Sequence, residues 1–149
     1  MKQEKFETYC ADGVKLSGLL LIPEKPKAVI QFNCGTATKK EFYLKFLTYL
    51  TENGYLCCLW NYRWTNESDN LKNRDLSYID YGIKDMPGIK SYLDKRFPHL
   101  PFMLIGHSVG GQQIGFMNNL DNVVGNINIA VSSGYWLYMP FKYRMRAYF

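Results

Sequence analysis

The feature that most constrains this chain is the run Gly106-His107-Ser108-Val109-Gly110. It directly follows the apolar residues 102–105 and directly precedes a segment of helical character. A G-x-S-x-G run between a strand and a helix is typical of a sharp turn that lifts the serine hydroxyl clear of a sheet. The glycines on either side leave room for the strained backbone that such a turn requires. We therefore expect Ser108 to lie in a turn at the end of a central strand.

Apolar runs alternate with amphipathic segments along the chain. Strand character is found at residues 6–10, 16–22, 28–33, 55–62, 102–106 and 123–131. Helical character is found at residues 41–52, at 78–97 with a break near Asp85 because of Pro87, and from 109 to about 119. In the first of these helices Phe42, Phe46 and Leu50 recur every four residues, with Tyr43 and Leu47 beside them. The polar segment 63–77 is expected to be a surface loop. Short apolar strands separated by helices predict an α/β fold, in which a mostly parallel sheet carries helices on both faces.

The size and charge of the chain narrow the class of protein. Its 149 residues are the size of one domain. The net charge of +5 comes from scattered Lys and Arg residues, so a solvated basic surface is favoured over nucleic-acid binding. No apolar stretch has the length of a membrane span, and the N-terminus leads into no signal-peptide core. We expect a cytoplasmic protein that neither binds nucleic acid nor spans a membrane.

The four cysteines, Cys10, Cys34, Cys57 and Cys58, form no C-x-x-C pair. Cys57 and Cys58 are adjacent in a strand-like run, so their side chains point to opposite faces of the sheet. This spacing favours reduced, partly buried thiols over a metal site or a disulfide framework.

Three shorter motifs accompany the 106–110 run. They are Asn33-Cys34-Gly35-Thr36-Ala37 followed by Phe42-Tyr43, then Asn61-Tyr62-Arg63, and finally Gly134-Tyr135-Trp136. Together they resemble the N-terminal half of an α/β-hydrolase: the loop after its third strand, an Asp-Tyr-Arg motif with asparagine replacing the acid, and the start of its lid. More narrowly, the chain is similar to bacterial predicted serine hydrolases near the serine aminopeptidase and monoglyceride lipase-like branch.

The resemblance implies a single domain that is truncated after about the sixth strand. Residues 1–134 would form the N-terminal part of the hydrolase core, and residues 135–149 would begin the lid. The strand at 123–131 is then expected to be an exposed sheet edge, which favours aggregation unless something covers it. The aromatic tail could fold back over this edge or bind a second chain, but we favour its being the first part of the lid.

The chemistry that the resemblance implies is acyl transfer to water, with Ser108 as the nucleophile. The oxyanion would be held by the backbone N–H of Val109 and by a second N–H, from Thr36 or Ala37. Small acyl esters are the expected substrates. No metal or organic cofactor is implied.

A base for this chemistry is harder to find, because the chain has only two histidines. His107 precedes the serine and is expected to face the packing layer of the sheet. His99 precedes the strand, about a strand's length from the serine, and Asp121 is expected at the same wrong end. The acid and base of a triad are therefore not found in this chain, and we expect it to be a feeble enzyme or none.

Three hypotheses follow for the chain. It is the front of a serine hydrolase, interrupted by a premature stop, a frameshift or the choice of fragment. Alternatively, it is half of a split enzyme whose partner chain supplies the acid, the base and the remaining strands. In the third hypothesis it is a non-catalytic interaction module that kept this half of the fold. We favour the first.

Overall fold

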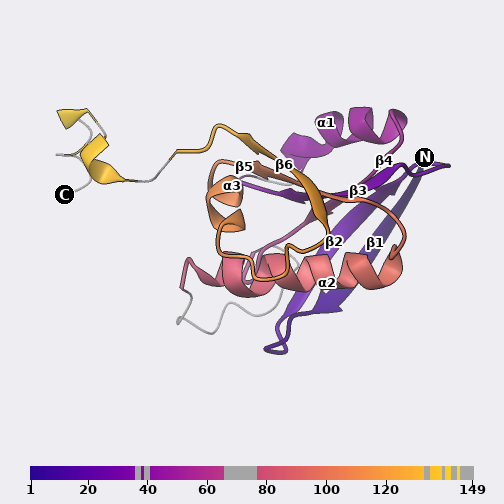
Figure 1. Ribbon diagram of the computed structural model, residues 1–149, viewed down its shortest axis with the longest axis horizontal. Helices are drawn as coiled ribbons and strands as arrows, with labels where there is room; N and C mark the ends of the chain where they lie inside the picture. The colour runs from indigo at the N-terminus through magenta and orange to yellow at the C-terminus, as the bar shows by residue number, and fades with distance from the viewer. Residues whose placement is uncertain are drawn as a thin grey trace.

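The computed structural model describes residues 1–35, 38, 41–65, 77–132, 135–138, 140, 141 and 144. Within them, one sheet has the strand order β1-β2-β4-β3-β5-β6 (Figure 1). Its strands are β1 (Lys2–Tyr9), β2 (Lys15–Ile22), β3 (Ala28–Asn33), β4 (Tyr55–Trp60), β5 (Phe102–His107) and β6 (Val123–Ile129). The first three strands of that order pair antiparallel, and all pairs from β4 to β6 are parallel. The predicted α/β fold with a mostly parallel sheet is confirmed.

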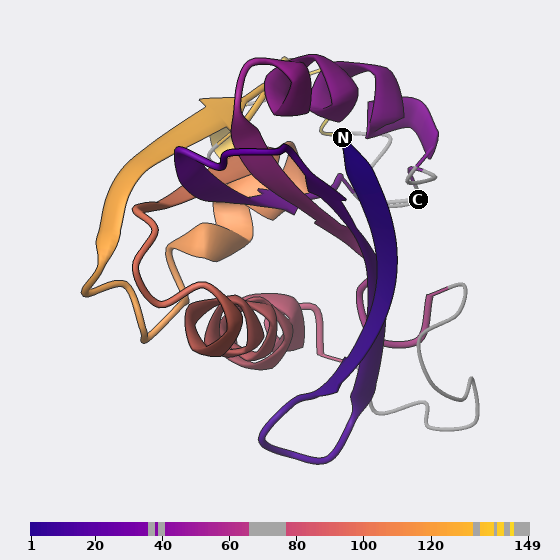
Figure 2. The same ribbon diagram turned by 90° about the vertical axis from the view of Figure 1, so that its right-hand side faces the viewer.

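The helices lie on both faces of this sheet, as Figure 2 shows. They are α1 (Glu41–Glu52), the π-helical turn η1 (Tyr81–Asp85), α2 (Met86–Arg96) and α3 (Val109–Ile114). The 3-10 turn η2 (Trp136–Tyr138) lies in the tail that follows β6. Two consecutive residues of β3 demonstrate the two faces. The Gln31 amide donates to the backbone oxygen of Met86 in α2, and the Phe32 ring packs against Tyr43 of α1 with 4.6 Å between ring centroids.

The predicted break in the second helical segment is present. The π-helical turn η1 ends at Asp85 and α2 begins at Met86, with Pro87 in its first turn. Proline is tolerated there because the first N–H groups of a helix have no intrahelical acceptor. The break therefore follows from local backbone chemistry.

Several predicted elements are longer than the structure has them, among them the strand predicted at 55–62, which ends at Trp60. The helix predicted from 109 to about 119 ends at Ile114, and tight i−3 bonds from Phe116 and Met117 continue the chain beyond it. Glycines at 110, 111 and 115 favour helix weakly, which explains the early end. The strand predicted at 123–131 ends at Ile129, because Ala130 adopts a left-handed φ of 51°.

The amphipathic helix predicted at 41–52 is present as α1, and one of its two apolar rows faces the sheet. Tyr43, Leu47 and Thr51 are the buried residues of this helix. Phe42 and Phe46, from the row singled out by its four-residue spacing, are 74% and 40% exposed. Both rows are apolar in their first two turns, so periodicity alone could not choose between them.

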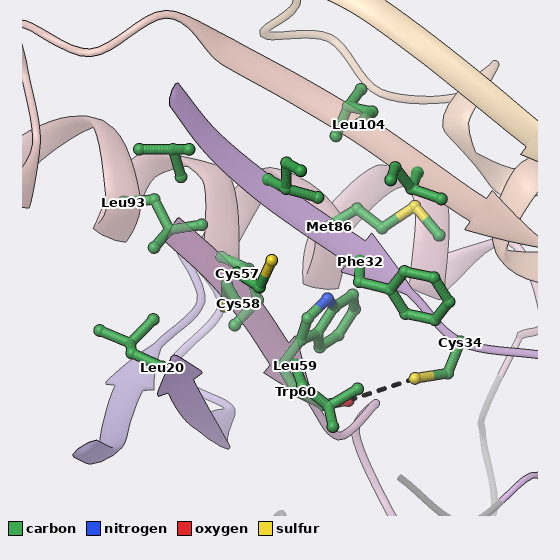
Figure 3. Close-up of a cluster of buried hydrophobic side chains, with 14 of the residues drawn as sticks. Leu20, Phe32, Cys34, Cys57, Cys58, Leu59, Trp60, Met86, Leu93 and Leu104 are labelled. Carbon is green, nitrogen blue, oxygen red and sulfur yellow. Dashed lines mark hydrogen bonds between the residues drawn. The ribbon is translucent and has the colours of Figure 1, made fainter. Parts of the chain in front are cut away.

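The core gathers large side chains from the inner strands and from α2 (Figure 3). They include Leu20, Phe32, Trp60, Met86, Leu93 and Leu104. All four cysteines are free and buried, more fully than the sequence predicted. Burial raises the pKa of the Cys34 thiol to about 12 and that of Cys57 to about 11. These thiols are therefore core residues with little thiolate character.

The strand β6 forms one edge of the sheet, as predicted. Val124 and Ile127 on this strand are 68% and 48% exposed. In the part of the tail that the structure describes, Tyr135, Leu137, Tyr138 and Phe141 are exposed as well. None of the described helices is long and apolar enough to cross a membrane.

Candidate active site

The turn between β5 and α3 holds Ser108 in a strained conformation, with φ 52° and ψ −119°. Its backbone N–H donates to the Ile129 oxygen of β6 at 2.9 Å, and its own carbonyl accepts from Gly111 and Gln112 in α3. Few non-glycine residues adopt a positive φ, and those that do are concentrated at functional sites. The sharp turn predicted for the 106–110 run is present.

Glycine is required at Gly110 by the close approach of α3 to the end of β3. A Cβ atom on Gly110 would collide with the backbone oxygens of Asn33 and Cys34. A Cβ on Gly106 would collide with the backbone of Gly111. The turn that carries Ser108 is therefore packed directly against the strand end from which the 34–40 segment departs.

The predicted oxyanion donors are only partly described. The Val109 N–H lies in the first turn of α3, where backbone N–H groups have no acceptor within the helix. Thr36 and Ala37 lie outside the described residues. The backbone just before them is held at two points. The Tyr62 hydroxyl donates to the Cys34 oxygen at 3.0 Å, and the Gly35 N–H donates to the Tyr43 hydroxyl at 3.0 Å.

His107 is half-buried on the α1 face of the sheet. Its Nδ1 lies 2.8 Å from the Tyr43 hydroxyl, and the two rings meet edge to face with 5.7 Å between centroids. Its orientation agrees with the expectation that His107 faces the packing layer. One of its ring nitrogens is thus engaged by a tyrosine of α1.

His99 and Asp121 lie at the other end of the sheet. His99 precedes β5 and Asp121 precedes β6, and the two strands start in register at Phe102 and Val123. A six-residue strand at about 3.3 Å per residue separates this end from Ser108 by roughly 20 Å. The positions predicted for His99 and Asp121, away from Ser108, are therefore confirmed. Among the described residues, no group of three or more His, Cys, Asp or Glu side chains could hold a metal ion.

A buried ionic cluster at the end of β4 was missed by the sequence analysis. Arg63, expected in a surface loop, is buried and binds Asp85 through its Nε at 2.6 Å and its backbone N–H at 2.8 Å. Its Nη1 also binds Asp12 in the β1–β2 turn at 2.9 Å. The rest of that expected loop, residues 66–76, lies outside the described residues. The sequence signals were the motif Asn61-Tyr62-Arg63 and a charged residue placed shortly after a buried strand.

The environment of this cluster shifts the pKa values of both carboxyl groups, in opposite directions. Burial raises the pKa of Asp85 to about 6, even though the hydrogen bonds from Arg63 act in the opposite direction. Burial also acts to raise the pKa of Asp12, but the hydrogen bonds and charge of Arg63 hold it below its usual range. The difference follows from exposure, since Asp85 is completely buried and Asp12 is not.

Solved structures with the same fold are esterases and other α/β-hydrolases. The α/β-hydrolase GrgF from Penicillium sp. sh18 has a TM-score of 0.70 at 19% identity, over 88% of this chain and 46% of that one. The Pyrococcus furiosus esterase Pf2001 has a TM-score of 0.71 at 19% identity, over 84% and 48%. A thermostable carboxyl esterase from Bacillus coagulans has a TM-score of 0.68 at 16% identity, over 86% and 44%. The chain thus spans less than half the length of these three structures.

The sequence itself matches no curated protein significantly. It does match the family described as "Serine aminopeptidase, S33" over residues 24–124, which is more than half of the chain. The matched range runs from the loop before β3 to the start of β6 and includes the Ser108 turn. The chain therefore belongs to the serine aminopeptidase family of α/β-hydrolases.

Proposed function

We propose that the protein hydrolyses acyl compounds with Ser108 as the nucleophile. The observation that carries this proposal is the positive φ of Ser108, in a turn between a central strand and a helix within a serine aminopeptidase family chain. The Ser108 hydroxyl would attack an ester or amide carbonyl carbon, and the carbonyl oxygen would become an oxyanion. The N–H of Val109 and that of Thr36 or Ala37 would stabilise it. Expulsion of the alcohol or amine and attack by water would complete the reaction.

The substrates that we propose are small acyl esters. Two of the three structural relatives above are named as esterases, and this is the basis for the choice of acyl class. We also propose that residues 1–134 form the N-terminal part of the hydrolase core and that residues 135–149 begin a lid. The proposed hydrolysis needs no metal or organic cofactor.

We propose that the 149-residue chain alone is a weak catalyst or an inactive one. A serine hydroxyl needs a neighbouring base to take its proton. His107 is engaged by Tyr43, and His99 lies at the far end of β5. In a well-studied serine protease, loss of the base lowers turnover by about a millionfold, and an oxyanion hole with binding retains roughly a thousandfold over water.

Association with a second polypeptide is the alternative, and the exposed β6 edge favours it. Val124 and Ile127 are exposed there. An apolar hollow of about 620 Å³ lies beside this strand, between α1 and Ile129. A second chain could pair with β6 and supply the acid and base, or the protein could associate with itself as a non-catalytic module. We also propose a cytoplasmic location, which the four free cysteines support.

The test is covalent labelling of the purified chain with a fluorophosphonate probe. We expect slow labelling that is absent in Ser108→Ala and unchanged in Ser91→Ala, which removes an exposed hydroxyl on α2. Labelling of wild type that does not exceed that of Ser108→Ala would contradict the proposal. Gel filtration with light scattering on the same samples distinguishes a monomer from the associated forms of the alternative.

A further inference from the structure

The two edges of the sheet differ in charge. At one edge, β1 carries the charged residues Lys2, Glu4, Lys5 and Glu7. At the other edge, β6 contains no charged residue and no proline. Charged residues and proline on an edge strand oppose its pairing with another chain. The sheet is therefore protected against such pairing at β1 and unprotected at β6.

The main chain of β6 directs hydrogen-bonding groups away from the sheet. The Ile129 carbonyl oxygen faces β5, because it accepts from the Ser108 N–H at 2.9 Å. Backbone groups alternate in direction along a strand, so the N–H and C=O groups of Asn126 and Asn128 point away from β5. In the part of the chain that the structure describes, β6 pairs with β5 alone and ends the sheet (Figure 2). These outward groups are thus placed to bind a further strand.

The regular part of β6 is shorter than the whole strand. Its register with β5 shifts after Val123, so that Val124 is an extra residue in the ladder. At the other end, the left-handed φ of 51° at Ala130 ends the strand. The regular stretch is therefore Gly125–Ile129, and its middle residue is Ile127.

The two faces of this stretch carry different side chains. Ile129 faces α1, because it lines the apolar hollow between β6 and that helix. Side chains alternate along a strand, so Gly125 and Ile127 share the α1 face. Asn126 and Asn128 are on the opposite face, and both are exposed. One face of the stretch is apolar and the other carries side-chain amides.

This arrangement is complementary to itself. When two copies of the stretch run antiparallel about Ile127, Asn126 lies opposite Asn128 of the partner subunit, and each such pair exchanges two main-chain hydrogen bonds. The side-chain amides of these residues hold both donors and acceptors, so they can bind one another as well. On the α1 face, Ile127 meets Ile127 of the partner subunit, and Ile129 lies opposite Gly125 of the partner subunit. Apolar groups then contact apolar groups, and amides contact amides.

Charge and symmetry favour a second copy of the chain as the occupant of this edge. Each chain carries a net charge of +5, which opposes self-association through charged surfaces, and the uncharged β6 edge avoids this repulsion. Once two β6 strands have paired, the remaining edges of the joint sheet are two charged β1 strands. A two-fold contact of this kind closes on itself. The assembly therefore ends at a dimer.

We propose that the protein forms a dimer in which the β6 strands of two copies pair antiparallel about Ile127 and join two sheets into one. Main-chain hydrogen bonds supply the affinity, and the side chains on the two faces fix the register. This inference does not depend on the chemistry of Ser108, and no part of its test measures catalysis.

Sedimentation velocity of the 149-residue chain tests the dimer. We expect a monomer–dimer equilibrium between about 1 and 100 µM, since a contact of this size is weak. Ile127→Lys places two ammonium groups at the two-fold axis, and we expect it to raise the dissociation constant at least about tenfold. Ile83→Lys is the matched control, because Ile83 lies on η1 and is 43% exposed, compared with 48% for Ile127.

Oxidative cross-linking tests the register. The four native cysteines are buried, so an introduced cysteine on β6 is distinguished from them by its exposure. In the proposed pairing the two Ile127 Cα atoms lie about 4.5 Å apart, within the range that a disulfide spans. Val124 is 68% exposed, but the two copies of this residue lie roughly 20 Å apart in the same pairing. We expect Ile127→Cys to form a covalent dimer at least about tenfold faster than Val124→Cys.

Several results would overturn the proposal. A monomer throughout this concentration range would mean that the β6 edge is unpaired or binds a different polypeptide. A dimer that Ile127→Lys leaves unchanged would form through another surface, and larger oligomers would contradict the closed arrangement. If Ile127→Lys does not fold, the cysteine variants decide the matter, because equal rates of cross-linking at the two positions exclude the proposed register.

Discussion

The carboxyl ends of β4 and β5 carry two sites that differ in completeness. At the end of β4, Arg63 is buried and both of its acidic partners, Asp85 and Asp12, are in place. At the end of β5, the backbone around Ser108 is strained and tightly packed, His107 is bonded to Tyr43 through Nδ1, and His99 lies at the far end of the strand. The first site is complete and connects the β1–β2 turn, the segment that follows β4 and the end of η1. The second has a strained and closely packed backbone, and its serine side chain has no hydrogen-bond partner among the described residues.

The largest effect that we expect comes from breaking the complete site. Arg63→Met leaves Asp85 buried without its cation, and removal of one partner of a buried ion pair destabilises by about 3–5 kcal/mol. The Arg63 side chain is 4% exposed and that of Asp85 is 0% exposed, so water cannot replace the lost bonds. Urea denaturation followed by circular dichroism measures the free energy of unfolding.

The control for this substitution is Arg96→Met. Arg96 pairs with Glu4, and both side chains are partly exposed, at 33% and 25%. Partly exposed pairs of this kind contribute less than about 1 kcal/mol. Equal losses of unfolding free energy in the two variants would show that the buried cluster after β4 stabilises the fold no more than a partly exposed ion pair does.

The second prediction concerns the pH dependence of the same cluster. The folded-state pKa of Asp85 is raised from 3.8 to about 6, so the folded protein binds this proton more tightly than the unfolded chain. Its contribution to stability is therefore complete below pH 3.8 and is lost as the pH rises through 6. We expect wild type to lose about 1–3 kcal/mol across this window relative to Asp85→Asn, which has no such titration.

Urea denaturation of both proteins between pH 4 and pH 7 measures this difference. Glu4 and Asp12 have lowered pKa values and act in the opposite direction at lower pH, but they are common to both proteins. The difference between the two curves isolates Asp85. Parallel curves would mean that Asp85 is ionised throughout, with Arg63 outweighing the effect of burial.

The same contrast explains what the sequence could predict. The Ser108 turn was predictable because its determinants are consecutive: an apolar strand, two glycines and a helical segment within about fifteen residues. The alternation of strands and helices and the break at Pro87 were also predictable, because each is determined by residues close together in the sequence. The exposed edge at β6 followed from the family resemblance, which supplied the order of strands.

The missed features depend on contacts between distant residues. Arg63 lies 22 residues from Asp85 and 51 from Asp12, so no local pattern shows which acidic residues it meets in the fold. Similarly, the choice between the two apolar rows of α1 was made by the neighbouring strands, which buried Tyr43 and exposed Phe42. Periodicity defines the apolar side of a helix only to within about one residue, and packing decides the rest.

The smallest change that we expect in the free energy of unfolding is at the strained Ser108 turn. It is an increase, whereas Arg63→Met causes a decrease. Ser108→Gly relieves the backbone strain of a positive φ, which costs about 1–3 kcal/mol. The greater freedom of glycine in the unfolded chain lowers the free energy of unfolding by about 0.5–1 kcal/mol. We expect a net gain in unfolding free energy of about 1 kcal/mol, measured by urea denaturation, and no gain in Ser108→Ala, which keeps the Cβ atom. A less stable Ser108→Gly would mean that the turn is not strained. A more stable one would mean that the turn retains a serine at the expense of stability, as expected where a residue is kept for its hydroxyl group and not for the fold.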